Sequence, residues 1–535
     1  MGGELTRSLQ INYGVFDLSL GVHYDIHPKN IPLGGAMFVN NLVWIDGYVR
    51  PRPGLVEEFP FVDSNEVVHI SQFVPLTGSI KLIRVSKTSG FTMHVHVFDP
   101  QTTAWTRITP LSGISGVLNS TGQAPSSTNF KGYWFIAPGN SELYYYDGTT
   151  FDTMSSNISD TNLLPFDKPL FVASTESRLF IANTLESKVG DSPLGRVPYR
   201  IAWCDKTDPF KWSTGGTDQA GSARFDDIVK ASQPITGIYG GANSNILVFK
   251  PTYVFQGTYV DSPRYYDFVQ MQSGPGCVSH QTINEWRDGK ILYLGDDNVY
   301  MQTVDQIPQA IGDKIRPKLS TFSRAISLDK SVAFIDRDND LGTIITPENV
   351  GIYAGQTLRQ FTISLRNGAW WEGVYTLAGD YVTCAFSYRY GVWQSKQLIG
   401  TKNGKIYTST LSSALDGANA FPISWMSGIV SFRELTGNKT ESAQLQVIRT
   451  YAESGQIKIG AYVGDNFDRF TYTDYGEQKH NGVGAVGVTE RATGENFKIL
   501  LYASDASVFP QTLSGVSIGF LLQGLTRLNT DYGVT

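Results

Sequence analysis

Three carboxylates stand at alternate positions of one short polar segment, at Asp336, Asp338 and Asp340. Calcium-binding loops use this spacing, because carboxylate oxygens are ligands that Ca²⁺ prefers. However, Leu341 occupies the position where such a loop needs glycine, and Pro347 occupies the position of its bidentate glutamate. The segment is therefore interpreted as a solvated turn, and a bound ion is the alternative.

Residues 482–487 read GVGAVG, which has the spacing of a dinucleotide-binding loop. Such a loop works only between a strand and a helix whose N-terminus receives the pyrophosphate. Residues 488–494 (VTERATG) have no helical pattern. A glycine-rich hairpin is the better interpretation, and no cofactor-binding residue is predicted.

Histidine and cysteine residues do not form a recognisable metal-binding pattern. His94 and His96 are two residues apart and would share one face of a strand, but no third ligand is identifiable. Cys204, Cys277 and Cys384 are odd in number and far apart in the sequence. They indicate neither a disulfide framework nor zinc, and we expect folding in a reducing cytoplasm.

Two pairs of adjacent acids, Asp226 with Asp227 and Asp296 with Asp297, are the nearest approach to a glycosidase signature. A glycosidase needs two carboxylates that face each other across the sugar. Adjacent residues of a strand point to opposite faces, so neither pair can be the catalytic dyad. With no nucleophile motif and no zinc-protease motif in the sequence, we predict that the protein is not an enzyme.

The composition is that of a large globular protein. Of its 535 residues, 41% are hydrophobic and 17% are charged, which is far from the composition of a disordered chain. The net charge of −6 argues against a sequence-independent nucleic-acid binder, which usually carries a basic excess. No signal peptide and no membrane-spanning run is expected.

Apolar residues alternate with polar ones over most of the chain, which predicts an all-β protein. Residues 133–148, 290–301 and 397–407 share one layout, in which a strand, a tight turn and a tyrosine-bearing strand follow each other. This is the layout of a β-propeller blade hairpin. The only helix expected, at 312–328, should be short or broken by Pro317.

These patterns predict three regions. Residues 1–58 should form an N-terminal assembly segment, and residues 59–420 should form a β-propeller of about six or seven blades. The longer strands expected at 423–432, 441–449, 456–463, 496–503 and 513–523 indicate a C-terminal β-sandwich-like module over 421–535.

The N-terminal segment contains the residues that we single out for assembly: Arg50, Arg52 and Gly54. Asp46-Gly47 suits a two-residue hairpin turn, and Pro53-Gly54 suits the centre of a type II turn. Arg50 and Arg52 would point to the same side of a strand, where they could pair with carboxylates of a neighbouring blade or subunit. A solvated turn without partners is the alternative.

Three stretches of the sequence carry a family resemblance. The first is 12–54, with the motifs NIPLGGA and DGYVRPRPG, and the second is 200–212, which reads RIAWCDKTDPFKW. The third contains blocks at 276–279, 288–300 and 311–315. In their order and spacing they resemble the tail proteins of podoviruses, the tubular tail nozzles and packaged-DNA-stabilising propellers. The resemblance implies a structural virion protein that forms a homohexameric ring below the tail adaptor and takes part in genome retention and ejection. Tail fibres are implied partners, and viral double-stranded DNA would pass through the ring lumen without specific binding. The chain lacks the large insertions of the longer nozzles, which leaves open whether it forms the tail tip or a middle ring.

The alternative from another class is a virion propeller that binds a receptor or glycan, or cleaves the glycan. Assembly state discriminates between the two, because glycan-cleaving tail spikes are typically trimeric β-helices and a nozzle should be six-fold. An intracellular scaffold propeller would be expected to show regular repeat signatures, which the sequence lacks.

Overall fold

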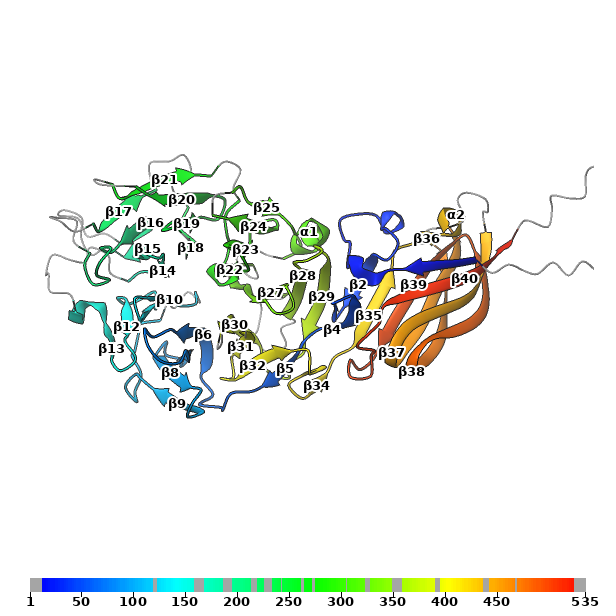
Figure 1. Cartoon of the computed structure of the whole chain (residues 1–535), viewed down its shortest axis with the longest axis horizontal. Helices are drawn as coiled ribbons and strands as arrows, with labels where there is room; N and C mark the ends of the chain where they lie inside the picture. Colours follow the sequence, from blue (N-terminus) through cyan, green and yellow to red (C-terminus); the bar gives the residue numbers. More distant parts are fainter. Residues whose placement is uncertain are drawn as a thin grey trace, which may run out of the picture.

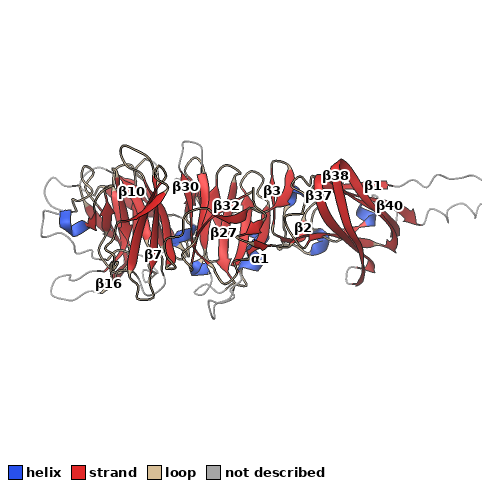
Figure 2. Cartoon of the chain, turned by 90° about the horizontal axis from the view of Figure 1, so that it is seen from below, coloured by secondary structure: helices blue, strands red, loops and turns tan. Residues whose placement is uncertain are grey.

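The computed structural model describes residues 12–118, 123–157, 168–185, 195–212, 219–225, 233–241, 243–260, 264–271, 275–304, 306–322, 328–348, 358–389, 395–435, 442–466 and 469–523. Nearly all regular structure in these residues is β. The strands form two bodies that lie side by side, a ring of sheets and a curled sheet (Figures 1 and 2). None of the helices in the described ranges is long and apolar enough to cross a membrane.

The ring is a β-propeller of seven blades, which confirms the predicted fold class. Blade 1 contains β6 (Glu66–Phe73), β7 (Lys81–Lys87), β8 (Met93–Asp99) and β9 (Ala104–Arg107). Blade 2 contains β10 (Ser126–Phe130), β11 (Tyr133–Ala137), β12 (Tyr144–Tyr146) and β13 (Phe151–Thr153). Blade 3 contains β14 (Phe171–Ser174), β15 (Leu179–Leu185), β16 (Arg196–Trp203) and β17 (Gly221–Arg224). Blade 4 contains β18 (Gly237–Gly240), β19 (Ile246–Phe249), β20 (Val254–Tyr259) and β21 (Tyr266–Gln270).

The later blades complete the circle. Blade 5 contains β22 (Asn284–Glu285), β23 (Lys290–Leu294), β24 (Val299–Thr303) and β25 (Gln309–Ala310). Blade 6 contains β26 (Val332–Asp336), β27 (Leu341–Pro347), β28 (Leu358–Ser364) and β29 (Trp370–Tyr375). Blade 7 contains β30 (Val382–Arg389), β31 (Ser395–Thr401), β32 (Ile406–Thr410), β33 (Leu415–Asp416) and β34 (Asn419–Ala420). The three hairpins predicted from the repeated layout are all blade hairpins, in blades 2, 5 and 7.

A strand from the beginning of the chain closes the ring. β5 (Gly54–Glu57) pairs antiparallel with β32, so the seventh blade contains strands from both ends of the propeller sequence. The inner strands β30 and β6 lie against each other at the closure. Because the chain runs from β5 directly to β6 of blade 1, the ring cannot open between blades 7 and 1 without breaking the hydrogen bonds between β5 and β32.

Short polar side chains bond the inner strands, whose free edges face the propeller axis. Ser126 Oγ donates to the carbonyl of Val172 in the next blade at 3.0 Å, and Ser387 Oγ donates to Ile335 at 2.9 Å. Thr383 Oγ1 also bonds to the backbone of the neighbouring inner strand. An unpaired strand edge leaves backbone groups without partners, and these side-chain bonds satisfy some of them. This accounts for polar residues on inner strands that would be expected to be apolar.

The second body is one sheet that branches. It contains β35 (Ile423–Ser427), β36 (Val430–Ser431), β37 (Ser442–Asn466), β38 (Arg469–Gly494), β39 (Asn496–Ala503) and β40 (Gly515–Gln523), with the short helix α2 (Phe432–Leu435). One edge of β37 pairs with β38, while its other edge pairs first with β40 and then with β39. Bulges in β37 let the two branches diverge around a common core that includes Ile457, Ile459 and Phe497. The strands expected at 441–449 and 456–463 are thus halves of one long strand.

The described residues of the N-terminal region, 12–58, do not form a segment of their own, which corrects the division expected at 1–58. β1 (Asn12–Phe16) pairs with β40 and β2 (Ala36–Asn40) pairs with β35, so both complete the C-terminal sheet. β3 (Leu42–Ile45) and β4 (Tyr48–Pro51) form a hairpin beside blade 6, and β5 closes blade 7. The sheet that each N-terminal strand joins is decided by pairing with strands far along the sequence, so the local pattern of residues does not reveal it.

The two predicted turns of this region have different outcomes. Asp46 and Gly47 have φ values of 51° and 91° between β3 and β4, as the predicted two-residue hairpin requires. The type II turn predicted at Pro53-Gly54 is wrong, because Gly54 is the first residue of β5 and pairs with Thr410. Glycine is needed there for space, since a Cβ on Gly54 would lie 2.4 Å from the carbonyl oxygen of Leu415.

The remaining helical elements are single turns. They are the 3₁₀ turns η1 (Leu18–Leu20), η2 (Pro28–Asn30), η3 (Met154–Asn157), η4 (His280–Thr282), η5 (Asp313–Ile315) and η6 (Leu328–Lys330), and the helix α1 (Arg316–Leu319). The helix expected at 312–328 is accordingly short, with Pro317 inside its first turn.

Candidate functional site

The two bodies meet at the outer edge of blade 6. β29 is the outermost strand of that blade, and residues of the N-terminal region bond to its free edge. Val22 N–H donates to the Trp370 carbonyl at 2.7 Å, and Asn41 N–H donates to the Glu372 carbonyl at 2.8 Å. An edge strand that would otherwise be open is therefore occupied by the chain that leads into the C-terminal sheet.

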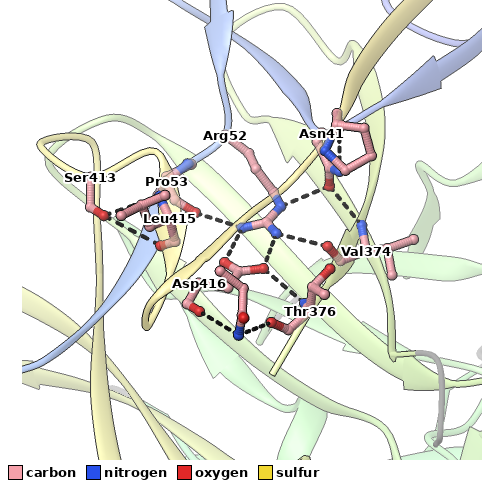
Figure 3. Close-up of polar contacts among 10 residues, drawn as sticks. Asn41, Arg52, Pro53, Val374, Thr376, Ser413, Leu415 and Asp416 are labelled. Carbon is pink, nitrogen blue, oxygen red and sulfur yellow. Dashed lines mark hydrogen bonds and ion pairs between the residues drawn. The ribbon is translucent and has the colours of Figure 1, made fainter. Parts of the chain in front are cut away.

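Arg52 lies at the centre of this contact and uses every donor of its guanidinium (Figure 3). Nη1 and Nη2 donate to the two carboxylate oxygens of Asp416, at 2.9 and 2.5 Å. Nε donates to Asn41 Oδ1 at 2.9 Å, and the carbonyls of Pro53 and Val374 accept the other two bonds at 2.9 and 2.7 Å. Arginine alone offers five donors in a planar fork, so lysine could not replace it.

The ion pair is completely buried. The side chain of Arg52 is 1% exposed and that of Asp416 is 0% exposed. The guanidinium carbon lies 4.5 Å from the ring centroid of Tyr375 and 4.0 Å from that of Phe421, so aromatic rings cover the cation. Burial raises the pKa of the Tyr375 hydroxyl, while the Arg52 cation lowers it and the Asp416 carboxylate raises it. Such a pair tolerates burial only because its geometry and its additional hydrogen bonds are complete.

Asn41 and Asp416 extend the network to backbone groups. Asn41, whose φ is 60°, accepts the Val374 N–H at 2.8 Å on its side-chain oxygen and donates to the Pro422 carbonyl at 2.7 Å. Asp416 accepts the Thr376 N–H at 2.8 Å. We call these five residues, Asn41, Arg52, Val374, Thr376 and Asp416, the Arg52 junction. It joins the N-terminal region, blade 6 and the segment that leaves blade 7 for the C-terminal sheet.

A second, partly buried network lies along the same strand. The Tyr24 hydroxyl donates to the Glu372 carboxylate, and Arg359 donates to Glu372 and, at 2.5 Å, to Glu348. Burial raises the pKa of Tyr24 strongly, and the neighbouring Glu372 carboxylate adds to this effect. The residues on both sides of β29 are thus fixed by charge-assisted hydrogen bonds.

The three residues singled out for assembly take different positions. Arg52 does pair with a carboxylate at a blade, but that carboxylate belongs to the same chain and the pair is inaccessible. Arg50 is half-buried on β4, opposite Val43, and its Nε is buried with no hydrogen-bond partner among the described residues. Gly54 lies at the close approach of β5 to the 413–415 loop. The structure therefore brings Arg52 and Gly54 together and leaves Arg50 outside the junction.

The three aspartates at 336, 338 and 340 do not converge on a common point. Asp336 accepts the N–H groups of Asp338 and Asn339 at 3.1 and 3.2 Å, which is a capped turn. Asp340 is buried and pairs with Arg366 at 2.7 Å. Burial raises the pKa of Asp336. Among the described residues, no group of three His, Cys, Asp or Glu side chains could hold a metal ion.

The other candidates from the sequence are also structural. Residues 482–487 are part of strand β38, so no helix follows them. Asp297 accepts the Tyr300 hydroxyl at 2.6 Å and pairs with Arg316 at 3.0 Å. Asp226 and Asp227 lie outside the described residues.

Sequence reasoning missed Asn41 and Asp416. The only local signal at Asp416 is the Asp416-Gly417 dipeptide, which predicts a turn and says nothing about its partner. Asp416 lies 364 residues from Arg52 in the sequence. Because every donor of Arg52 and both oxygens of Asp416 are occupied, the Arg52 junction has no group left to bind a ligand. It fixes the N-terminal segment against blades 6 and 7.

Comparisons with known proteins add little to this picture. No protein-family model matches the chain, and no curated protein matches it. Among solved structures, YCF48 from Cyanidioschyzon merolae is 9% identical, with a TM-score of 0.38 over 68% of this chain and 99% of that chain. YCF48 bound to a D1 peptide is 8% identical, with a TM-score of 0.36 over 67% of this chain and 97% of that chain. PorZ, a surface component of the type IX secretion system of Porphyromonas gingivalis, is 11% identical, with a TM-score of 0.32 over 78% of this chain and 46% of that chain.

Proposed function

We propose that this chain is a structural component of a short-tailed bacteriophage tail, a ring-forming nozzle that continues and closes the DNA channel below the adaptor. In this role the function of the protein depends on its shape and its rigidity. Copies arranged in a ring must hold a fixed orientation while DNA passes through the common lumen, and each copy must be rigid across its two bodies.

The position of the resemblance blocks is the observation that carries the proposal. Residues 12–54 and 311–315 are far apart in the sequence, yet both lie against β29. Trp370 Nε1 donates to the Ile311 carbonyl at 2.6 Å, and Tyr24 N–H donates to the Lys314 carbonyl at 2.9 Å. Two of the blocks that resemble podovirus tail proteins, 12–54 and 311–315, therefore lie where the propeller joins the C-terminal sheet, while the blocks at 200–212, 276–279 and 288–300 lie in or next to blades 3 and 5. A shared requirement for this joint accounts for the resemblance of these two blocks.

The charge of the chain is compatible with this role. With a net charge of −6 per copy, a ring would repel a polyanion and let it slide. We therefore expect weak binding of double-stranded DNA at physiological ionic strength.

Electron microscopy of the purified protein with its adaptor tests the proposal. We expect six-fold rings, and we expect antibodies against the chain to label the tail of the virion. A strict monomer or a trimer, both alone and with adaptor, would overturn the proposal.

A glycan-binding virion propeller is the second candidate, and a groove between blades 6 and 7 favours it. The groove has a volume of about 450 Å³ and is lined mostly by polar side chains, among them Asp338, Asn339, Gln397 and Thr408. Amides, carboxylates and hydroxyls are the groups that bond sugar hydroxyls. Binding of host polysaccharide that Asp338→Ala abolishes, by a protein that does not form rings, would favour this function over the nozzle.

A further inference from the structure

Blade 1 contains a group of polar side chains on a face that should be apolar. On β7, Arg84 and Ser86 point to the side of blade 7. In the antiparallel register with β8, Arg84 lies directly opposite His96 and Ser86 lies directly opposite His94. The four side chains therefore form a contiguous square, which we call the blade 1 polar square. The neighbouring pair on the same face, Leu82 and Phe98, belongs to the hydrophobic core between blades 1 and 7.

The blade 1 polar square is buried and incompletely bonded. Its four side chains are between 0% and 8% exposed. Within the described residues, Arg84 Nε and Nη1, Ser86 Oγ and His96 Nδ1 are buried atoms without a hydrogen-bond partner. Leaving so many buried polar atoms unpaired is costly, and native proteins normally supply a water or an ion at such a place.

The charges around the blade 1 polar square favour an anion over a water. Arg84 Nη2 pairs with Asp63 at 2.7 Å, and its other bonds go to carbonyl oxygens. Arg107 adds a second cation, whose guanidinium donates to His94. Two arginines thus face one carboxylate, which leaves an excess of one positive charge beside the buried Arg84 and the half-buried Arg107.

The histidines do not change this balance. Burial, together with the positive charge of Arg84, lowers the pKa of His96 to about 4. Burial and Arg107 lower the pKa of His94 as well. Both rings are therefore neutral at pH 7, and they leave the excess positive charge of the two arginines unchanged.

We propose that the blade 1 polar square binds one small monovalent anion, with chloride as the ligand in the cell. The anion accepts hydrogen bonds from the free donors of Arg84 and from the Ser86 hydroxyl, and it neutralises the excess charge. The burial of all four side chains restricts the site to a small ion.

Thermal unfolding in two salts tests the proposal. At equal ionic strength, the unfolding midpoint should be higher in sodium chloride than in sodium gluconate, and it should rise with the logarithm of the chloride concentration. Crystals soaked in bromide should show an anomalous peak within hydrogen-bonding reach of Arg84 and Ser86. Equal midpoints in the two salts, or a water without anomalous signal at this position, would overturn the proposal.

Three variants separate the site from general salt effects. Ser86→Ala removes one donor with little change of volume, and we expect it to raise the chloride concentration for half of the effect by roughly five- to tenfold. Arg84→Met should abolish the chloride effect. Arg178→Met is the matched control, because Arg178 is also fully buried with an unpartnered Nε, but it bonds carbonyls and an amide of blade 3. A chloride effect that persists unchanged in Ser86→Ala would count against the site even where Arg84→Met fails to fold.

Discussion

Asp416→Asn is the sharpest perturbation of the Arg52 junction. The substitution keeps the size of the side chain and removes its charge, so Arg52 remains buried without a carboxylate. The asparagine side chain offers one acceptor oxygen where the carboxylate uses two. Its NH₂ group would face a guanidinium N–H of Arg52, at a place where the native nitrogen–oxygen distance is 2.5 or 2.9 Å. Breaking a buried ion pair by removing one partner costs about 3–5 kcal/mol, and we expect a value in this range.

Two measurements report this loss. Urea denaturation followed by circular dichroism gives the change in the free energy of unfolding. Hydrogen exchange gives a local reading at the amides of Val374 and Thr376, which bond to Asn41 and Asp416 in the native protein. Both amides should exchange faster in Asp416→Asn, because the carboxylate that orders this edge is gone.

An exposed pair supplies the control. Arg316 pairs with Asp297 at 3.0 Å, and both side chains are at least half exposed. Exposed pairs contribute about 0.2–1 kcal/mol, so Arg316→Met should cost less than about 1 kcal/mol. If Asp416→Asn loses no more stability than Arg316→Met, or if the two amides exchange at native rates, the argument from burial is refuted.

Two further predictions concern the ring. Gly54→Ala should destabilise the protein by about 1–3 kcal/mol and speed proteolysis near blade 7, because the new Cβ would lie 2.4 Å from the Leu415 carbonyl oxygen. Gly195→Ala, where nothing lies within 4 Å, is its control and should show native stability. Burial lowers the pKa of His69 to about 3 and that of His280 to about 4, both from 6.5, so the folded state binds fewer protons than the unfolded state below pH 6.5. The contribution of each histidine to the free energy of unfolding should be complete above that pH, and it should fall by up to about 1.4 kcal/mol per pH unit as the pH drops towards 4. A flat profile of unfolding free energy against pH, or a profile that His280→Gln leaves unchanged, would contradict this.

The sequence predicts those features of this fold that depend on neighbouring residues. Alternation of apolar and polar residues predicts sheets, and Asp46-Gly47 predicts its hairpin turn, because each signal acts over a few residues. Gly54 shows where local reasoning fails. Proline before glycine favours a type II turn, but the conformation is decided by pairing of β5 with β32, more than three hundred residues later in the chain.

The Arg52 junction could not be predicted for the same reason. The arginine is identifiable as a candidate, but its partner is one of many aspartates, and only the folded ring brings Asp416 to it. The polar residues of the inner strands and of the blade 1 polar square are a second case. Their types argue against buried strands, and they become intelligible only when the edges and charges that they face are known.

Residues 12–57 couple the two bodies to each other. β1 and β2 belong to the C-terminal sheet, and β5 belongs to blade 7, so neither body is complete without this one segment. Its partners β32, β35 and β40 all lie beyond residue 400, which means that the N-terminal strands cannot pair until most of the chain has been made. Arg52 stands between β2 and β5, at the point where the segment passes from one body to the other. The acceptors of Arg52 come from the N-terminal segment, from Val374 of blade 6 and from Asp416 of blade 7, so this buried charge is fully paired only where the segment lies against both blades.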